Sequence, residues 1–346
     1  MTGTQRIVGR LTVLGGTFLA SLLAIALVVG ISVGIGDLPI PLSTTWSAVT
    51  NRLGWTTVEL SRIHETVIWD YRLSRALVAA FCGAGLALSG AIMQSLLRNP
   101  LAEPYVLGIS AGASSGAVAI VILGIGSGAL SLSAGAFAGA FAAFLFVALL
   151  SNGTRGGADR TILAGVAASQ LFNAATSYIV TTSGNAQQAR DVMFWLLGSF
   201  GGVRWPEFML VSIVVGLGLA ACLTAARVLD AFAFGDEAAS ALGVDVGRAR
   251  ITLFALTALM TATIVSMVGS IGFVGLVVPH AARFFVGPTH IRLLPACAIA
   301  GAIFMVLADI ASRVLIPQQT LPVGVVTALV GVPFFSLILY RFQRAS

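Results

Sequence analysis

The chain contains no lysine and little charge of either sign. Of its 346 residues, 58% are hydrophobic and only 9% are charged, and the mean hydropathy is +0.99. A soluble domain carries about 25% charged residues, so this composition indicates that lipid is the solvent for most of the chain. All 19 basic residues are arginines. They are scattered singly between apolar runs, which argues against a nucleic-acid-binding protein.

Cysteines, histidines and enzyme motifs are also scarce. The three cysteines lie singly in apolar runs, so they give neither metal-ligand spacing nor a disulfide framework, and we expect small buried side chains. The sequence has no H-E-x-x-H or Walker A motif, and it predicts neither an enzyme nor a resident cofactor or metal. His280 lies in PHAAR without a partner at ligand spacing, which favours a structural role over a metal ligand. His64 and His290 carry no assignment.

The chain contains long apolar runs without charged residues. The run at about 76–97 follows Arg72 and Arg75, has no charge and closes on Arg98-Asn99-Pro100. An uncharged run of about twenty residues crosses a ~30 Å hydrocarbon core as a helix. The next run restarts after Glu103-Pro104. This charged, proline-broken corner predicts two membrane helices joined at the membrane surface.

Small residues are concentrated in the run at 76–97, where Gly83, Gly85 and Gly90 alternate with alanine and serine. Small side chains let neighbouring membrane helices approach closely. A lone lipid anchor has no need of them. The run therefore predicts a helix packed among other helices.

Ten such runs predict an all-α polytopic membrane protein with one domain, residues 1–346. Residues 36–71, rich in tryptophan and charge, are expected outside the membrane, and 192–200 as a surface helix. The run at 272–285 is only about 21 Å long as a helix, so it is expected to be short or partly re-entrant. The first run is too long for a signal-peptide core and is expected to be retained. The expected spans are about 11–35, 73–97, 105–124, 134–150, 161–182, 207–226, 251–268, 272–285, 293–312 and 322–340.

The arginines predict the orientation in the membrane. Placing both termini in the cytoplasm puts most arginines on the cytoplasmic side, as the positive-inside bias expects. An unusual number still fall outside, among them Arg72, Arg75 and Arg313. The number of arginines expected on the outer side of the membrane needs a separate explanation.

Asp309 is the acidic residue that falls well inside an expected span. It lies four residues before Arg313, a spacing that favours an i,i+4 ion pair near a helix end. The alternative is an ionisable centre of a proton- or sodium-coupled carrier, a class that usually keeps such groups at mid-membrane. The ion pair is the favoured interpretation, so an ion-coupled carrier is poorly supported.

A charged segment at about 234–248 has the character of a docking site for a soluble partner. Asp236 and Glu237 fall in a predicted first helical turn, where negative charge is favoured. Leu242 and nearby alanines form a small apolar face, and Gly243 can end the helix. Such a helix-turn-helix fits a groove on a soluble protein. An amphipathic connector on the lipid surface is the alternative.

Several long blocks follow one another in the order found in a known family. They are RLSR (72–75), SGAIMQSLLRNPLAEPYVLGISAGA (89–113), LAGVA (163–167), FWLLGSF (194–200), GDEAASALGV (235–244), GSIGFVGLVVPHAARFFVG (269–287), ADIASR (308–313) and LPVGVVTALVGVPFF (321–335). With these blocks the chain, from Arg72 onward, resembles the FecCD family of type II ABC-importer permeases for iron–siderophores, haem and vitamin B12. Ser74 departs from the family's usual proline and is expected to loosen the start of the second span.

The resemblance implies roles for particular residues. Three arginines would contact acidic residues on a substrate-binding protein, with lipid-headgroup anchoring as the alternative; they are Arg72, Arg75 and Arg313. A second set would couple the chain to the ATPase: Gly235, Asp236, Glu237, Ala238, Leu242 and Gly243. A third set would form the gate and pathway: Asn99, Leu101, Gln170, Asn173, Ser177 and Thr327. For Asn99, a simple capping role remains an open alternative. For the other polar side chains, the open alternative is interhelical hydrogen bonding.

The sequence thus predicts the permease subunit of an ATP-driven importer in a bacterial cell membrane, most readily for ferric siderophores, with haem or vitamin B12 as alternatives. The implied partners are a cytoplasmic ATPase dimer, an extracytoplasmic binding protein, a second permease copy or paralogue, the iron chelate and membrane lipid. Two other classes stay as rivals: an ion-coupled carrier and a receptor or scaffold that transports nothing.

Overall fold

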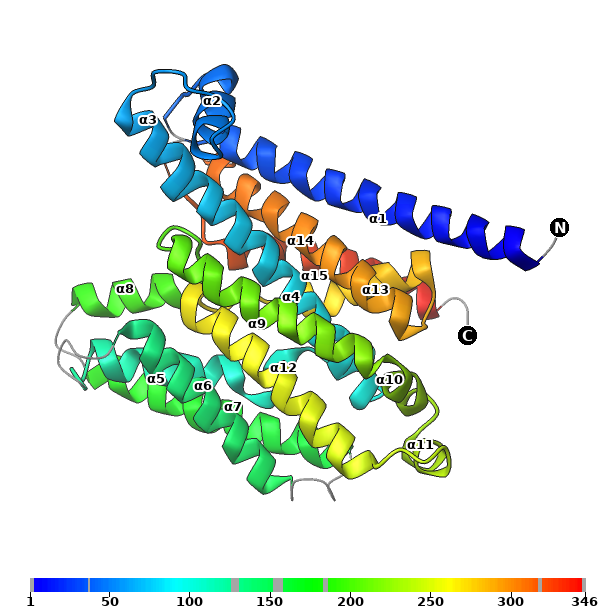
Figure 1. The fold of residues 1–346 in the computed structure, drawn as a ribbon. Helices are drawn as coiled ribbons and strands as arrows, with labels where there is room; N and C mark the ends of the chain where they lie inside the picture. Colours follow the sequence, from blue (N-terminus) through cyan, green and yellow to red (C-terminus); the bar gives the residue numbers. More distant parts are fainter. Residues whose placement is uncertain are drawn as a thin grey trace.

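The computed structural model describes residues 3–36, 38–125, 131–151, 158–182, 186–316 and 319–343. In these ranges the regular structure is entirely helical, which confirms the predicted all-α class. Helices satisfy every backbone hydrogen bond within the segment, which lipid requires. The overall arrangement is a bundle of long helices with several short ones at its ends (Figure 1).

Apolar helices lie at all ten positions where the sequence predicts spans. Six described helical stretches are long and apolar enough to cross a membrane, and four shorter apolar helices accompany them. In chain order the ten are α1 (Gly3–Gly34), α4 (Ser74–Leu96), α5 (Ile109–Val121), α6 (Leu132–Leu150), α7 (Ala158–Thr182), α9 (Trp205–Thr224), α12 (Val246–Val268), α13 (Val274–Val286), α14 (His290–Val314) and α15 (Val323–Gln343).

The remaining helices are short and connect the long ones. They are α2 (Leu42–Arg52), α3 (Arg62–Thr66), the π-helical η1 (Val67–Leu73), the 3-10 helix η2 (Pro104–Leu107), α8 (Ala186–Leu196), α10 (Ala226–Phe232) and α11 (Asp236–Ala241). The beginning of α1, the end of α15, α10 and α11 gather at one end of the bundle, called here the α11 end (Figure 1). The opposite end, with α2, α3 and α8, is called the α2 end.

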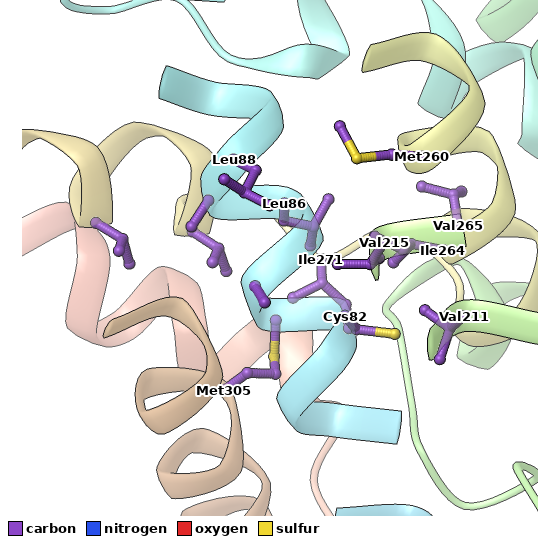
Figure 2. Packing of buried hydrophobic residues seen from close by; sticks show 14 of the residues in the cluster. Cys82, Leu86, Leu88, Val211, Val215, Met260, Ile264, Val265, Ile271 and Met305 are labelled. Carbon is purple, nitrogen blue, oxygen red and sulfur yellow. The ribbon is translucent and has the colours of Figure 1, made fainter. Parts of the chain in front are cut away.

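Helix α4 is the centre of the bundle. In the stretch Arg62–Leu96, which contains α4, 89% of the most apolar window is buried inside the chain, and α4 contacts α1, α9, α12, α13 and α14. Figure 2 shows Cys82 and Leu86 of α4 among side chains of α9 and α12, with Met305 of α14 on another side. Cys82 is buried in this core. The predicted role of the cysteines as small buried side chains is confirmed for all three.

Glycines allow α4 to touch its neighbours backbone to backbone. A Cβ atom added to Gly90 would lie 1.8 Å from the carbonyl oxygen of Gly275 on α13, and one on Gly83 would lie 2.1 Å from the carbonyl oxygen of Gly301 on α14. No L side chain fits at such distances. The predicted close packing of this run is therefore confirmed, and glycine is required at both positions.

One detail of the sequence prediction differs from the structure, and another is not tested. At the start of α4 the Ser74 hydroxyl donates to the carbonyl of Asp70 at 2.6 Å, and helix continues from Arg62 through the π-helical η1, so a looser start stays a prediction. The third span begins at Ile109 rather than 105, because Gly108 takes a left-handed conformation (φ +71°) after η2. Helix α5 is consequently short, 13 residues or about 20 Å.

Candidate functional site

Arg75 and Arg313 converge on one buried carboxylate at the α2 end. Asp309 on α14 has no exposed surface. Arg75 Nε donates to Asp309 Oδ1 at 2.9 Å, and its Nη2 lies 2.8 Å from the same oxygen. Arg313 Nη2 lies 3.2 Å from Oδ2, one helical turn away. The predicted Asp309–Arg313 pair is confirmed, and Arg75 is an additional partner.

The same cluster holds the end of α1. Arg313 Nη1 donates to the carbonyls of Ser32 and Ile35, and its Nη2 donates to the Ser32 hydroxyl at 2.7 Å. Arg72 donates to the carbonyls of Val33 and Leu38. The last carbonyls of a helix lack partners within the helix and carry partial negative charge, so two guanidinium groups stabilise them. The cluster therefore joins α1 to α4 and α14.

The three arginines predicted to dock a binding protein are thus brought together, but each of them is bound to groups within the chain. Arg72 is only 7% exposed, and the side chains of Arg75 and Arg313 are 16% and 8% exposed. With three guanidinium groups and one carboxylate, the cluster keeps a formal charge of +2. Their docking role stays a prediction, and the observed role is to join helices.

At the α11 end, the predicted coupling segment forms a short helical pair. Helix α11 starts with Asp236 and Glu237 in its first turn. Gly235 (φ +99°) and Gly243 (φ +83°) occupy left-handed conformations on either side of it, which L side chains rarely adopt. Leu242 is 71% exposed. The predicted helix start, glycine stop and outward apolar side chain are all present.

One residue of this segment points inward. Asp236 accepts two hydrogen bonds from Arg250 Nη2, at 2.7 and 2.8 Å, and Arg250 on α12 is 4% exposed. The Arg250 guanidinium also lies over the Phe232 ring, 5.6 Å from its centroid. Asp236 therefore fixes α11 to α12, while Glu237, Ala238 and Leu242 are left as the surface-facing part of the predicted set.

Asn99 caps the turn that follows α4. Its Oδ1 accepts a hydrogen bond from the Leu101 backbone N–H at 2.9 Å, and its own N–H donates to the Gln94 carbonyl at 3.2 Å. Leu101 is 44% exposed. The capping interpretation of Asn99 is confirmed. A role of Asn99 and Leu101 in a gate stays a prediction, now located at the α11 end beside the coupling segment, since Arg98 packs against Gly235.

The predicted pathway residues divide into two groups. Gln170, Asn173 and Ser177 are exposed on α7, so in the single chain they are available to a passage or to another subunit. Thr327 has no exposed surface, and its hydroxyl donates to the Gly324 carbonyl at 3.0 Å. Thr327 therefore packs inside the chain, and the exposed residues of α15 begin at Leu329.

An open apolar groove of about 560 Å³ lies between the end of α8, residues 270–273 and α15. Sequence reasoning did not identify it, because its walls come from three segments far apart in the chain. Its lining residues are Leu196, Leu197, Ser270, Gly272, Phe273, Gly324, Val325, Ala328, Leu329, Val332 and Pro333.

The groove borders a break between α12 and α13. Phe273 has a left-handed conformation (φ +68°) and directly precedes α13. The Tyr105 hydroxyl donates to the Ile271 carbonyl at 2.9 Å and accepts from the Ile271 N–H at 3.1 Å. Glu103 accepts a hydrogen bond from the Phe273 backbone. Irregular backbone at membrane depth is stable where protein supplies such partners.

His280 lies on α13 next to this break and is partly buried. Among the described residues, no group of three or more histidine, cysteine or acidic side chains is arranged to hold a metal ion. The predicted structural role of His280 stays the simplest interpretation. His290, which the sequence left unassigned, has buried polar partners instead, Asp230 and Ser95.

Comparison with known proteins places this geometry in a family. Residues 22–341 match the FecCD transport family. The cobalamin import system permease protein BtuC of Halobacterium salinarum is 38% identical over 337 residues, covering 93% of this chain and 87% of the relative. The Fe(3+) dicitrate transport system permease protein FecD of Escherichia coli is 36% identical and covers 90% and 94%.

A solved structure agrees along the whole chain. It is an inward-facing conformation of a transporter assigned to the metal-chelate type of ABC transporter. It superposes with a TM-score of 0.82 at 29% identity and covers 94% of this chain and 99% of its own. The predicted family and fold class are therefore confirmed.

Proposed function

The chain belongs to the FecCD transport family as a permease subunit of an ABC importer, and from this premise we propose that its cargo is a metal chelate. The observation that carries the proposal is the near-full-length similarity to two permeases with different named cargoes. Cobalamin and ferric dicitrate share one chemistry, a metal ion held in an organic chelate. A ferric siderophore, the cargo favoured by the sequence, belongs to the same class, as do haem and vitamin B12.

A passage for such a cargo would be wide and nearly free of charge. The groove beside α15 is lined mostly by apolar side chains, and α15 presents further exposed apolar residues, including Val330 and Leu337. A second copy or a paralogue packed near this face would enclose the groove and the polar residues of α7. Exposed apolar patches of this kind mark interfaces with protein or lipid.

The energy would come from a separate ATPase pair docked at the α11 end. Leu242 and Phe234, 71% and 79% exposed, flank α11 and suit an apolar groove on a soluble partner. The α11 end would then be cytoplasmic. The beginning of α1 and the end of α15 lie toward that end (Figure 1), as the predicted orientation requires. No hydrolysis of ATP is assigned to this chain.

A binding protein would deliver the chelate at the α2 end. The formal +2 charge of the Arg72, Arg75, Arg313 and Asp309 cluster would attract acidic lobes and orient the encounter. Direct contact by these arginines would require exchange of the internal hydrogen bonds described above. Steering by charge requires no such exchange, so it is the part of the docking prediction that the structure best supports.

Uptake by cells with and without the gene tests the cargo. Labelled cyanocobalamin, haemin and a ferric siderophore would be supplied separately to the two strains. Loss of one chelate on deletion, restored by the gene, is the expected result. Unchanged uptake of all three together with lost uptake of a chemically unrelated nutrient would contradict the proposal.

A further inference from the structure

A chain of hydrogen bonds at the α11 end joins three helices through His290. The His290 ring Nδ1 lies 2.6 Å from Asp230 Oδ1 on α10, and the His290 backbone N–H donates to the same oxygen at 2.9 Å. On its other side, His290 Nε2 lies 2.6 Å from the Ser95 hydroxyl on α4. One ring therefore spans from α10 to α4, and it does so from the first residue of α14.

Two of the three side chains in this link are buried. Ser95 is 7% exposed and His290 4%, and the Asp230 side chain is 34% exposed. Hydrogen bonds to a carboxylate are stronger than neutral ones, and a low local dielectric strengthens them further. Asp230 also lies at the N-terminus of α14, where negative charge is favoured. The two hydrogen bonds between Asp230 and His290 therefore hold α10 firmly against the start of α14.

Serine, histidine and aspartate in this order also form hydrolase triads. Ser95 does not fit that use, because it is buried and the Ala91 carbonyl, 3.1 Å away, competes with His290 for its single hydroxyl proton. A substrate could not reach it without separation of the helices. The arrangement is better suited to holding helices at a fixed spacing.

Asp230 and Ser95, the two ends of this link, lie next to the predicted coupling segment and the predicted gate, respectively. Asp230 lies in α10, which a short turn connects to α11. Arg250 contacts both Phe232 of α10 and Asp236 of α11. Ser95 lies in the last turn of α4, directly before the turn capped by Asn99. Arg98 of that turn packs against Gly235 at the start of α11.

We propose that His290 is a positioning residue that transmits displacement of α10 and α11 to the Asn99 turn at the end of α4. The inference rests on the proposed ATP-driven import. The rigid imidazole ring has a hydrogen-bonding nitrogen on either side. A displacement of Asp230 therefore displaces the ring and, with it, Ser95. Loss of either contact leaves ATPase docking intact but weakens the connection between α10 and α4, which then depends on the direct packing of the two helices alone. His290 therefore sets how many chelate molecules are carried for each ATP hydrolysed.

The test uses the complete importer in proteoliposomes with its ATPase and binding protein. The chelate is the one, among cyanocobalamin, haemin and a ferric siderophore, that the wild type carries. For His290→Ala we expect ATPase co-purification and hydrolysis close to wild type, and a fall of about tenfold in chelate carried per ATP, within the usual range of coupling between sites. Ser95→Ala should give a similar fall. The double variant should be no worse than the single ones, because one link is lost in each.

His280→Ala is the matched control, since it removes another histidine, on α13, that has no part in the link. It should keep the wild-type ratio of transport to hydrolysis. A wild-type ratio in His290→Ala would overturn the inference and leave the proposed function intact. A parallel loss of assembly, thermal stability, hydrolysis and transport would also overturn it, because His290 would then only hold the fold. Absence of ATP-dependent transport by the wild type would refute the proposed function itself.

Discussion

Arg75 and Asp309 form an ion pair across 234 positions of sequence, with Arg75 Nη2 2.8 Å from Asp309 Oδ1. Arg313 occupies the other oxygen of the same fully buried carboxylate. Because the carboxylate is shared by two guanidinium groups, Asp309 is a structural charge that keeps α4, α14 and α1 together. This arrangement leaves little basis for an ion-coupled carrier centred on Asp309.

Replacement of Asp309 by asparagine is therefore expected to destabilise the protein. The variant leaves two buried guanidinium groups without their counter-ion, which typically costs about 3–5 kcal/mol. Thermal unfolding in detergent would measure the loss. Asp245→Asn is the control, because its pair with Arg248 is exposed and asparagine can still cap α12. Equal stability of the two variants would contradict the assigned role of Asp309.

Gly90→Ala should separate α4 from α13. The added Cβ would meet backbone at Gly275, which cannot yield as a side chain can, so we expect a loss of about 1–3 kcal/mol, as for overpacked cores. Gly216→Ala on α9 is the matched control, because a Cβ there meets nothing within 4 Å and alanine favours helix. A Gly90→Ala variant as stable as the control would show that the helices are not in close contact.

The coupling surface is best tested on its outward residues. Glu237→Arg combined with Leu242→Asp should lower co-purification of the ATPase about tenfold, equivalent to a loss of 1.4 kcal/mol in binding. The unfolding temperature should stay unchanged, since both side chains face outward. Asp236→Arg is a poor test because it also breaks the pair with Arg250. Normal co-purification of the double variant would refute the assignment of α11.

Docking of the binding protein should depend on the charge of the α2 end. Arg75→Gln lowers the cluster charge from +2 to +1, so affinity at low ionic strength should fall roughly threefold, as for long-range steering. In about 1 M salt the Debye length is ~3 Å, and the variant and the wild type should converge. Arg75→Lys, which keeps the charge, is the control. If the affinity for the binding protein changes neither with salt concentration nor with Arg75→Gln, the α2 end is not its docking surface.

Local patterns explain how much of the fold the sequence could predict. The apolar runs identify the ten apolar helices, because lipid requires apolar side chains along every span. The i,i+4 spacing of Asp309 and Arg313 predicts their pair, and Gly243 predicts the end of α11. Each of these features depends on residues close together in the sequence.

The parts that could not be predicted depend on distant residues. Nothing near Arg75 indicates that it binds Asp309 and not a partner protein. His290 lies 60 positions from Asp230 and 195 from Ser95, so only the folded chain brings them together. The groove beside α15 likewise has walls from three separate segments. The sequence singled out the arginines of the α2 end and the Asp309–Arg313 pair, but not the contacts of Arg72 and Arg75 within the chain.

The ATP dependence of chelate uptake tests the central claim most directly. Membrane vesicles containing the permease, its ATPase and the loaded binding protein would be supplied with ATP, or deprived of it, with and without an uncoupler. Uptake that requires ATP and survives collapse of the proton gradient is the predicted result. Uptake that follows the proton gradient and ignores ATP would contradict assignment of the chain to an ATP-driven importer.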